Sequence, residues 1–248
     1  MRRSLLIDLN CDLGEDESPE GLARDLALLD VVTSANIACA GHAGSEATMR
    51  RLVEACQTRG VRIGAHPGYE DRARFGRVEL DLDARTVRRS VAEQVARLAA
   101  IARDGGGVVT HVKPHGALYH AAMRRPEIAD AVMQGAADVL ASASLVGLAN
   151  AMGTKRWDAA GRSVEHEAFA DRRYDADGSL LARTAPGAVL DDPARAAAQA
   201  RAIATGGGVM LPSGDTLKVV ATTLCVHSDS PGSLDIARAV AAAIAKDR

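Results

Sequence analysis

Aromatic residues and long hydrophobic runs are both scarce in this sequence. Only 2% of its 248 residues are Phe, Trp or Tyr, so few side chains can stack against bases or sugars. The apolar run at the start covers about four residues before Asp8, which is shorter than the core of a secretory signal. No later run approaches the roughly 20 apolar residues of a membrane-spanning helix. We therefore expect no membrane partner.

Cysteine motifs and an excess of positive charge are also missing. The four cysteines lie far apart without a C-x-x-C pair, which argues against a zinc ribbon or a dithiol redox site and favours a reducing, cytoplasmic location. With 30 basic and 32 acidic residues, the chain lacks the basic footprint of a nucleic-acid-binding protein. The phosphate-binding pattern G-x-x-x-x-G-K-[ST] is absent as well. The expected partner is a small molecule or another protein.

A repeated order of short apolar run, polar cluster, amphipathic helix and glycine is present, as is typical of βα units. We predict strands at residues 5–9, 31–38, 61–65, 108–112, 144–148, 164–169 and 218–226. We predict helices at residues 19–29, 46–59, 86–103, 116–123, 126–141 and 149–161, with two more starting at Pro193 and at Ser230-Pro231. Seven strands in this repeat favour a seven-stranded parallel β/α barrel, TIM-like, as one domain over residues 1–248; two smaller domains are the alternative at this length.

The stretch HVKPHGALYH at residues 111–120 lies where a predicted strand ends and a loop begins. Lys113 and His115 are our main candidates for chemistry there, because alternate strand residues share a face and a lysine entering a barrel needs an anionic partner. That partner is either a substrate carboxylate or Glu167. His111 lies inside the strand, where a hydrogen-bonded core histidine is the expected role.

Polar residues lie at the end of, or just after, every predicted strand except the fifth, and in a parallel barrel all these ends open on one face. The set comprises Asp8, Asn10, Asp12, Asn36, His42, His66, His111, Lys113, His115, Glu167, Asp171, Arg172, His227 and Asp229. From this set and the loop DRARFGR, which holds Arg72, Arg74 and Arg77, we select candidates for substrate binding. They are Asn10, Asn36, His42, His66, Arg77, Asp171, Arg172 and His227.

Several of these residues have structural roles as alternatives. His42 lies between glycines and can be a loop residue bonded to its own backbone, while His66 before a proline can anchor a turn. The arginines of the loop can form a solvated basic face instead of a carboxylate clamp. Cys39 is near enough to His42 in sequence to be a nucleophile, but a buried structural thiol is favoured.

At these same residues the sequence resembles the LamB/YcsF family, the A subunit of bacterial ATP-dependent 5-oxoprolinase. The resemblance rests on seven blocks in order: DLNCDLGE at 8–15, SANIACAGHAG at 34–44, GAHPGYED at 64–71, FGR at 75–77, HVKPHGALYH at 111–120, FADRRYDADGSL at 169–180 and CVHSDSPGSLDIAR at 225–238. It implies a seven-stranded barrel of the glycoside hydrolase and deacetylase type.

The resemblance also implies a reaction, namely ATP-dependent opening of the lactam of 5-oxoproline to L-glutamate in company with two further subunits. ATP is then a co-substrate of the complex, which accounts for the missing P-loop. In this hypothesis Asp12, Glu167 or His115 is the general base, and Lys113 with nearby histidines stabilises the developing oxyanion. A homo-oligomer is also compatible with the sequence.

The chain departs from the family pattern at three positions. Ala40 and Ser228 replace glycines and are expected to narrow the pocket or strain a turn. Ser45 replaces an aspartate and is expected to cap the following helix.

Two other functions remain open from the residues alone. One is a metal-dependent deacetylase or amide hydrolase in which Asp12, His42 and His66 bind a divalent metal. The other is a non-catalytic subunit that binds a small acid for its partners.

Overall fold

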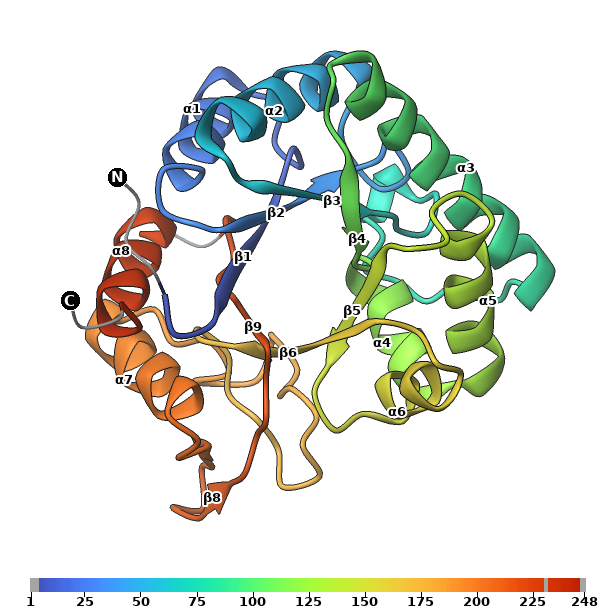
Figure 1. Cartoon of the computed structure of the whole chain (residues 1–248). Coiled ribbons are helices and arrows are strands. Elements are labelled where there is room, and N and C mark those ends of the chain that lie inside the picture. The colour runs from blue at the N-terminus through green and yellow to red at the C-terminus, as the bar shows by residue number, and fades with distance from the viewer. Residues whose placement is uncertain (1–4, 230–231, 246–248) are drawn as a thin grey trace.

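Seven parallel strands form a closed barrel in the computed structural model, which describes residues 5–229 and 232–245. The order around the barrel is β1-β2-β3-β4-β5-β6-β9, and helices surround the strands on the outside (Figure 1). This confirms the predicted seven-stranded parallel barrel. The barrel strands are β1 (Asp8–Leu13), β2 (Ser34–Ala38), β3 (Arg62–His66), β4 (Val109–Val112), β5 (Ser144–Leu148), β6 (Val164–Phe169) and β9 (Thr223–Cys225).

The helices lie between these strands in chain order. They are α1 (Pro19–Leu28), α2 (Glu46–Arg59), α3 (Ala84–Asp104), α4 (Gly116–Arg124), α5 (Pro126–Ala137), α6 (Met152–Ala159), α7 (Pro193–Ala204) and α8 (Ser233–Ala243), with a 3₁₀ turn η1 (Arg72–Arg74). Ser18 and Ser45 cap α1 and α2 by accepting hydrogen bonds from the backbone N–H groups of Gly21 and Thr48. Gly60 ends α2 in the left-handed conformation, at φ 63°.

The first and last barrel strands differ from the prediction. The first strand was predicted at residues 5–9, but β1 begins only at Asp8 and continues to Leu13, so its bounds were wrong and the polar residues expected at its end lie inside it. Within the predicted strand 218–226, only β9 enters the barrel. The segment before it contains β8 (Thr216–Leu217), which pairs antiparallel with β7 (Val209–Met210). The predicted start of the last helix at Ser230-Pro231 lies outside the described residues.

The interior of the barrel is polar, whereas the hydrophobic core lies between the strands and the helices. Along β1, Leu9 and Cys11 belong to the hydrophobic core, while the alternating Asp8, Asn10 and Asp12 face inward. Asn10 donates to Thr223 Oγ1 on β9 at 2.7 Å and accepts from Asn36 on β2 at 2.9 Å. These hydrogen bonds satisfy the buried polar groups, as a buried amide requires.

A glycine allows one long contact across this interior. His111 Nε2 on β4 reaches Asn36 Oδ1 on β2 at 3.0 Å, passing over β3. A Cβ atom on Gly64 of β3 would come within 2.0 Å of His111 Nε2, so any other residue there would displace the ring. His111 therefore has the core role predicted for it.

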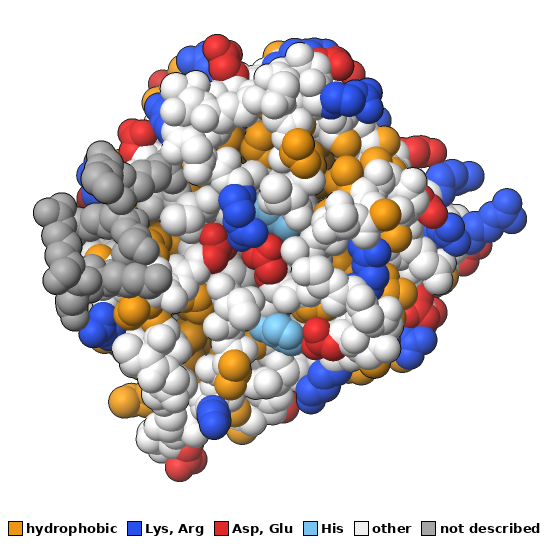
Figure 2. Space-filling view, in the orientation of Figure 1, with side chains coloured by type: hydrophobic (Ala, Val, Ile, Leu, Met, Phe, Trp, Pro, Cys, Tyr) orange, Lys and Arg blue, Asp and Glu red, His pale blue; other side chains and the backbone are white. Residues whose placement is uncertain are grey.

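The view along the barrel shows a small group of charged side chains of both signs, with a histidine beside them, at the centre of one face (Figure 2).

Over the described residues, no helix combines the length and the apolar character needed to cross a membrane.

Candidate functional site

A cavity of about 370 Å³ lies at the carboxyl ends of the barrel strands, where the prediction placed the site. The predicted residues that line it are Asp12, His66, Arg77, Lys113, His115, Arg172 and His227. The other predicted residues are not among its lining; these are Asn10, Asn36, His42, Glu167 and Asp171. The cavity is of a size suited to a small molecule.

Lys113 is held between two carboxylates at the base of the cavity. Its Nζ lies 3.0 Å from Asp12 Oδ1 and 2.8 Å from Glu167 Oε1. Tyr119 donates to the other oxygen of Glu167 at 2.8 Å, and the Glu167 side chain has no exposed surface. Although burial opposes its charge, Asp12 and Glu167 raise the pKa of Lys113 well above its ordinary value. Lys113 thus holds the two carboxylates in place, and its charge is already balanced by them.

His227 and Asp171 form a hydrogen-bonded pair at the side of the cavity. His227 Nδ1 lies 2.9 Å from both oxygens of Asp171, and the His227 backbone N–H also donates to Asp171 at 2.9 Å. Although burial opposes ionisation, these contacts with His227 lower the pKa of Asp171. A charged Asp171 keeps the proton on Nδ1, so the lone pair of neutral His227 is at Nε2.

Arg172 brings a buried positive charge to the same cavity. Its Nη2 donates to the carbonyl oxygen of Leu181 at 2.6 Å, but its buried Nε has no hydrogen-bond partner within the described ranges. Burial, followed by repulsion from Arg183, lowers the pKa of Arg172. Arg77 and Arg183 are both paired with Asp229, at 2.6 Å and 2.9 Å. Of these three arginines, Arg172 is therefore the one best able to form a new hydrogen bond to an anionic ligand.

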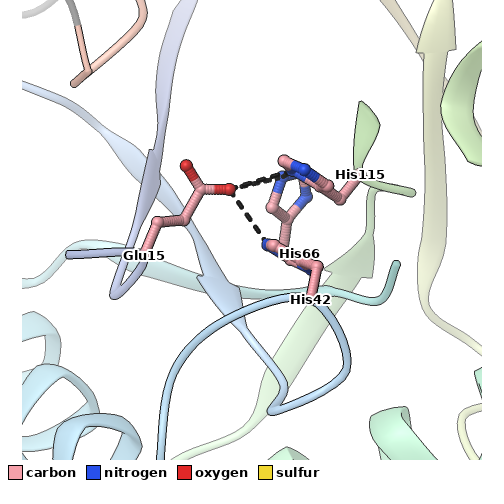
Figure 3. Close-up of side chains that lie close together, drawn as sticks. All are labelled: Glu15, His42, His66 and His115. Atoms are coloured by element: carbon pink, nitrogen blue, oxygen red, sulfur yellow. Dashed lines mark hydrogen bonds and ion pairs between the residues drawn. The ribbon is translucent and has the colours of Figure 1, made fainter. Parts of the chain in front are cut away.

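Glu15 and three histidines form a compact cluster beside Asp12. Glu15 Oε1 lies 2.9 Å from His115 Nδ1, 3.0 Å from His42 Nε2 and 3.7 Å from His66 Nε2. Figure 3 shows the three rings gathered on one side of the Glu15 carboxylate. One ligand atom from each of the four side chains falls within 4.8 Å of the others. Imidazole nitrogen and carboxylate oxygen are a donor set that binds transition metals.

Backbone carbonyls set the tautomers of two of these histidines. His66 Nδ1 lies 2.8 Å from the carbonyl oxygen of Lys113, and His115 Nε2 lies 2.9 Å from that of Phe75. Because a carbonyl oxygen only accepts, both of these ring nitrogens carry the proton. The lone pairs of neutral His66 and His115 are therefore on the nitrogens that face Glu15.

The electrostatics of the cluster are dominated by its carboxylates. Burial opposes the charge on Glu15, but its contacts with His115 and His42 hold its pKa well below the usual range. Burial lowers the pKa of His42 to about 4. The pKa of His66 is raised despite burial, because Asp12 and Glu15 attract a positive charge there. The site thus concentrates negative potential at His66.

His42 lies behind the cluster and does not reach the cavity. Its ring is stacked on that of His115 with the centroids 3.6 Å apart and the planes 2° from parallel. Its Nε2 faces Glu15, and its buried Nδ1 has no partner within the described residues. The predicted direct contact of His42 with a ligand in the cavity is therefore not favoured.

The buried cysteine and the three departures from the family pattern have local explanations. Burial raises the pKa of Cys39 to about 12, which favours the structural role. Ala40 has φ 65°, a left-handed conformation that glycine adopts without strain. Ser228 lines the cavity and donates to the carbonyl oxygen of Asp12 at 2.7 Å. Ser45 caps α2 as expected.

Glu15 is the residue of the site that the sequence analysis missed. It was within the DLNCDLGE block, and it is the first charged residue after β1. Gly14 precedes it at φ 78°, and this turn carries the chain off the strand. The sequence signal that could have identified Glu15 is a carboxylate directly after a glycine at a strand end.

Three comparisons place this geometry among known proteins. The sequence pattern of the LamB/YcsF family matches residues 7–248. The chain is 44% identical over 239 residues to the A subunit of 5-oxoprolinase from Corynebacterium glutamicum strain R, covering 96% of this chain and 95% of that protein. The same-named protein of strain ATCC 13032 is 43% identical over 239 residues, with the same coverage.

Solved structures show the same architecture. The lactam utilization protein from Thermus thermophilus superimposes with a TM-score of 0.89 at 36% identity, covering 96% of this chain and 95% of that one. A family 4 carbohydrate esterase from Streptomyces lividans has a TM-score of 0.50 at 11% identity, covering 98% of this chain and 88% of that one. The esterase likeness concerns the fold alone.

Proposed function

This chain belongs to the LamB/YcsF family, and we propose that it is one of the subunits of an ATP-dependent 5-oxoprolinase that opens the lactam of 5-oxoproline to L-glutamate. The observation that carries the proposal is the combination, in one cavity of about 370 Å³, of a cation without a full set of partners and an oriented histidine. A small cyclic amide with a carboxylate suits these two side chains, because its carboxylate can bind the cation and its amide can react near the histidine.

Arg172 is the proposed anchor for the substrate carboxylate. Arg172 lines the cavity and its guanidinium forms no ion pair among the described residues, so a carboxylate there gains a charge-assisted hydrogen bond without displacing an existing ion pair. Arg77 and Arg183 line the same cavity but are already paired with Asp229. They are proposed to support the rim.

His227 is the proposed general base. Asp171 holds its Nδ1–H at 2.9 Å, so Nε2 is the nitrogen able to take a proton from water. Glu167 is less suited to this role, since Lys113 and Tyr119 occupy its oxygens and it does not line the cavity. His115 is also less suited, because Phe75 and Glu15 occupy both ring nitrogens.

ATP enters the proposal as a co-substrate of the complex. Opening a five-membered lactam is uphill, and phosphorylation of the lactam oxygen makes its carbon more reactive toward water. Two further 5-oxoprolinase subunits are the proposed partners, in line with the names of the relatives, which describe each of them as one subunit of the enzyme. We place the complex in the cytoplasm, which suits a chain whose cysteines are all buried and form no disulfide among the described residues.

The test is glutamate release from 5-oxoproline and ATP. It is measured with this chain alone and then with the two other subunits of a bacterial 5-oxoprolinase. Release in the complete mixture is the expected result. No release, with all three proteins folded and assembled, would contradict the proposal.

Two variants separate catalysis from binding. His227→Gln is expected to lower kcat by at least about 100-fold, the usual contribution of a general base. Arg172→Met is expected to raise KM for 5-oxoproline roughly 10- to 100-fold, since it removes a charged hydrogen bond. His166→Gln and Arg173→Met are the matched controls, because neither residue lines the cavity. Unchanged kcat in assembled His227→Gln would favour the non-catalytic, acid-binding role.

A further inference from the structure

One oxygen of Glu15 and one ring nitrogen each of His66 and His115 lie close together. No single proton can form hydrogen bonds among all three of these atoms. His66 Nε2 lies 3.1 Å from His115 Nδ1, and His115 Nδ1 lies 2.9 Å from Glu15 Oε1. Since carbonyl oxygens fix the N–H on the far side of both rings, each neutral ring presents a lone pair to the centre. Electron pairs therefore face each other at contact distance.

A single proton does not resolve these contacts. A proton on His115 Nδ1 can point toward Glu15 or toward His66. Whichever it points toward, the other contact has no well-aligned hydrogen bond. Protons on both rings would place two N–H groups against each other at 3.1 Å. A cation at the centre, by contrast, satisfies all three atoms together.

The spacing of the three atoms suits a divalent transition metal. Ligand atoms at about 2.1 Å from a common zinc ion lie roughly 3.0 to 3.5 Å apart for octahedral to tetrahedral geometry. The three separations here are 2.9, 3.1 and 3.7 Å. Asp12 Oδ2 lies 3.4 Å from His66 Nε2 and adds a further carboxylate next to the centre.

We propose that Glu15, His66 and His115 bind one divalent transition-metal cation, with Zn²⁺ as the probe. All three residues line the cavity, so a coordination position is open to a ligand there. A metal at this point would supply Lewis acidity. Asp12, His42 and His66 were the metal ligands considered from the sequence. Of these, His66 is kept as a ligand, and Asp12 lies next to the proposed metal position. Glu15 and His115 take the place of His42.

His42 has a positioning role in this centre. Its ring plane is parallel to that of His115 at 3.6 Å, so one metal ion cannot lie in both ring planes. Its Nε2 instead contacts the liganding oxygen of Glu15 at 3.0 Å, which orients the carboxylate as outer partners of metal ligands do. Gly76 packs against both histidine side chains, since a Cβ there would lie 2.8 Å from His42 Cβ and 3.1 Å from His115 Cδ2.

The experiment measures metal binding to the isolated full chain without lactam, ATP or other subunits. After chelator treatment, Zn²⁺ is titrated by calorimetry, and Co²⁺ is added to record the visible absorption of a nitrogen- and oxygen-ligated ion. We expect one equivalent of metal per chain. This inference goes beyond the proposed function, so a chain that binds metal but releases no glutamate, or the reverse, separates the two proposals.

Variants locate the site. Glu15→Gln and His66→Gln are each expected to weaken Zn²⁺ binding by more than roughly 100-fold, and His42→Gln by roughly 10- to 100-fold. Glu17→Gln is the matched control, because Glu17 is two positions away but contacts Thr48 and Arg72 instead of the cluster. Circular dichroism of each variant checks that it is folded. Absence of Zn²⁺ and Co²⁺ binding in the folded wild-type chain, or unchanged affinity in Glu15→Gln and His66→Gln, would overturn the proposal.

Discussion

Replacing Asp25 with asparagine isolates the effect of one buried carboxyl group on the turn that presents Glu15. Asp25 lies in α1 with 1% of its surface exposed, and its Oδ2 accepts the backbone N–H of Gly14 at 2.8 Å. Its Oδ1 is buried with no hydrogen-bond partner in the described part of the chain. Asparagine can keep the bond to Gly14 while removing the possibility of a charge.

The magnitude follows from the environment of this carboxyl group. Burial is the main cause that raises the pKa of Asp25 from 3.8 to about 7; Glu15 and Asp16 add to the rise, while the Gly14 hydrogen bond and Arg24 oppose it. Below about pH 4 the group is protonated in both the folded and the unfolded chain. Between about pH 4 and 7 the unfolded chain ionises first, so the contribution of this group to stability falls as pH rises. The total loss is about 4 kcal/mol at about 1.4 kcal/mol per pH unit.

The assay is urea unfolding at several pH values between about 4 and 8, followed by circular dichroism. The free energy of unfolding of Asp25→Asn minus that of the wild type is expected to increase with pH and to level off above about pH 7. Asp30→Asn, at an exposed aspartate just after α1, is the control and should show no such increase. A difference that stays constant with pH would refute the reasoning.

Three further substitutions test other features of the fold and site. Ala40→Gly should raise the free energy of unfolding by about 1 kcal/mol in urea titrations, because it relieves a left-handed alanine at φ 65°; a loss of stability would contradict this. Lys113→Met should destabilise by about 3 to 5 kcal/mol by removing the buried positive charge between Asp12 and Glu167, and adding Glu167→Gln should restore part of the loss if the ion pair is the cause. Ser228→Gly should cost about 1 kcal/mol through its lost hydrogen bond to the Asp12 carbonyl, with no cost expected if that bond is unimportant.

The order of elements could be predicted because it depends on local periodicity. Short apolar runs, helix caps and glycines recur along the chain, so the βα repeat and the seven-stranded barrel follow from neighbouring residues. Ser45 was predicted as a cap because capping needs only the next three residues. The helix at residues 46–59 was predicted with its correct bounds for the same reason.

The boundaries of the first and last strands required knowledge of the partners. Asp8, Asn10 and Asp12 look like a polar strand end, but they lie inside a strand because the barrel interior supplies their hydrogen bonds. Similarly, residues 218–226 are rich in β-branched side chains, and pairing with β1 and β6 limits the barrel strand to Thr223–Cys225.

By itself, the sequence determined that polar side chains from distant strands meet at one end of a parallel barrel, since that convergence follows from βα connectivity. Only the tertiary structure decided what each side chain does there. Lys113 is saturated by two carboxylates, and His42 lies behind His115 instead of reaching the cavity. Glu15 became central because three histidines from separate parts of the chain lie beside its carboxylate. Distances between residues far apart in the chain depend on packing, and local sequence patterns carry no record of them.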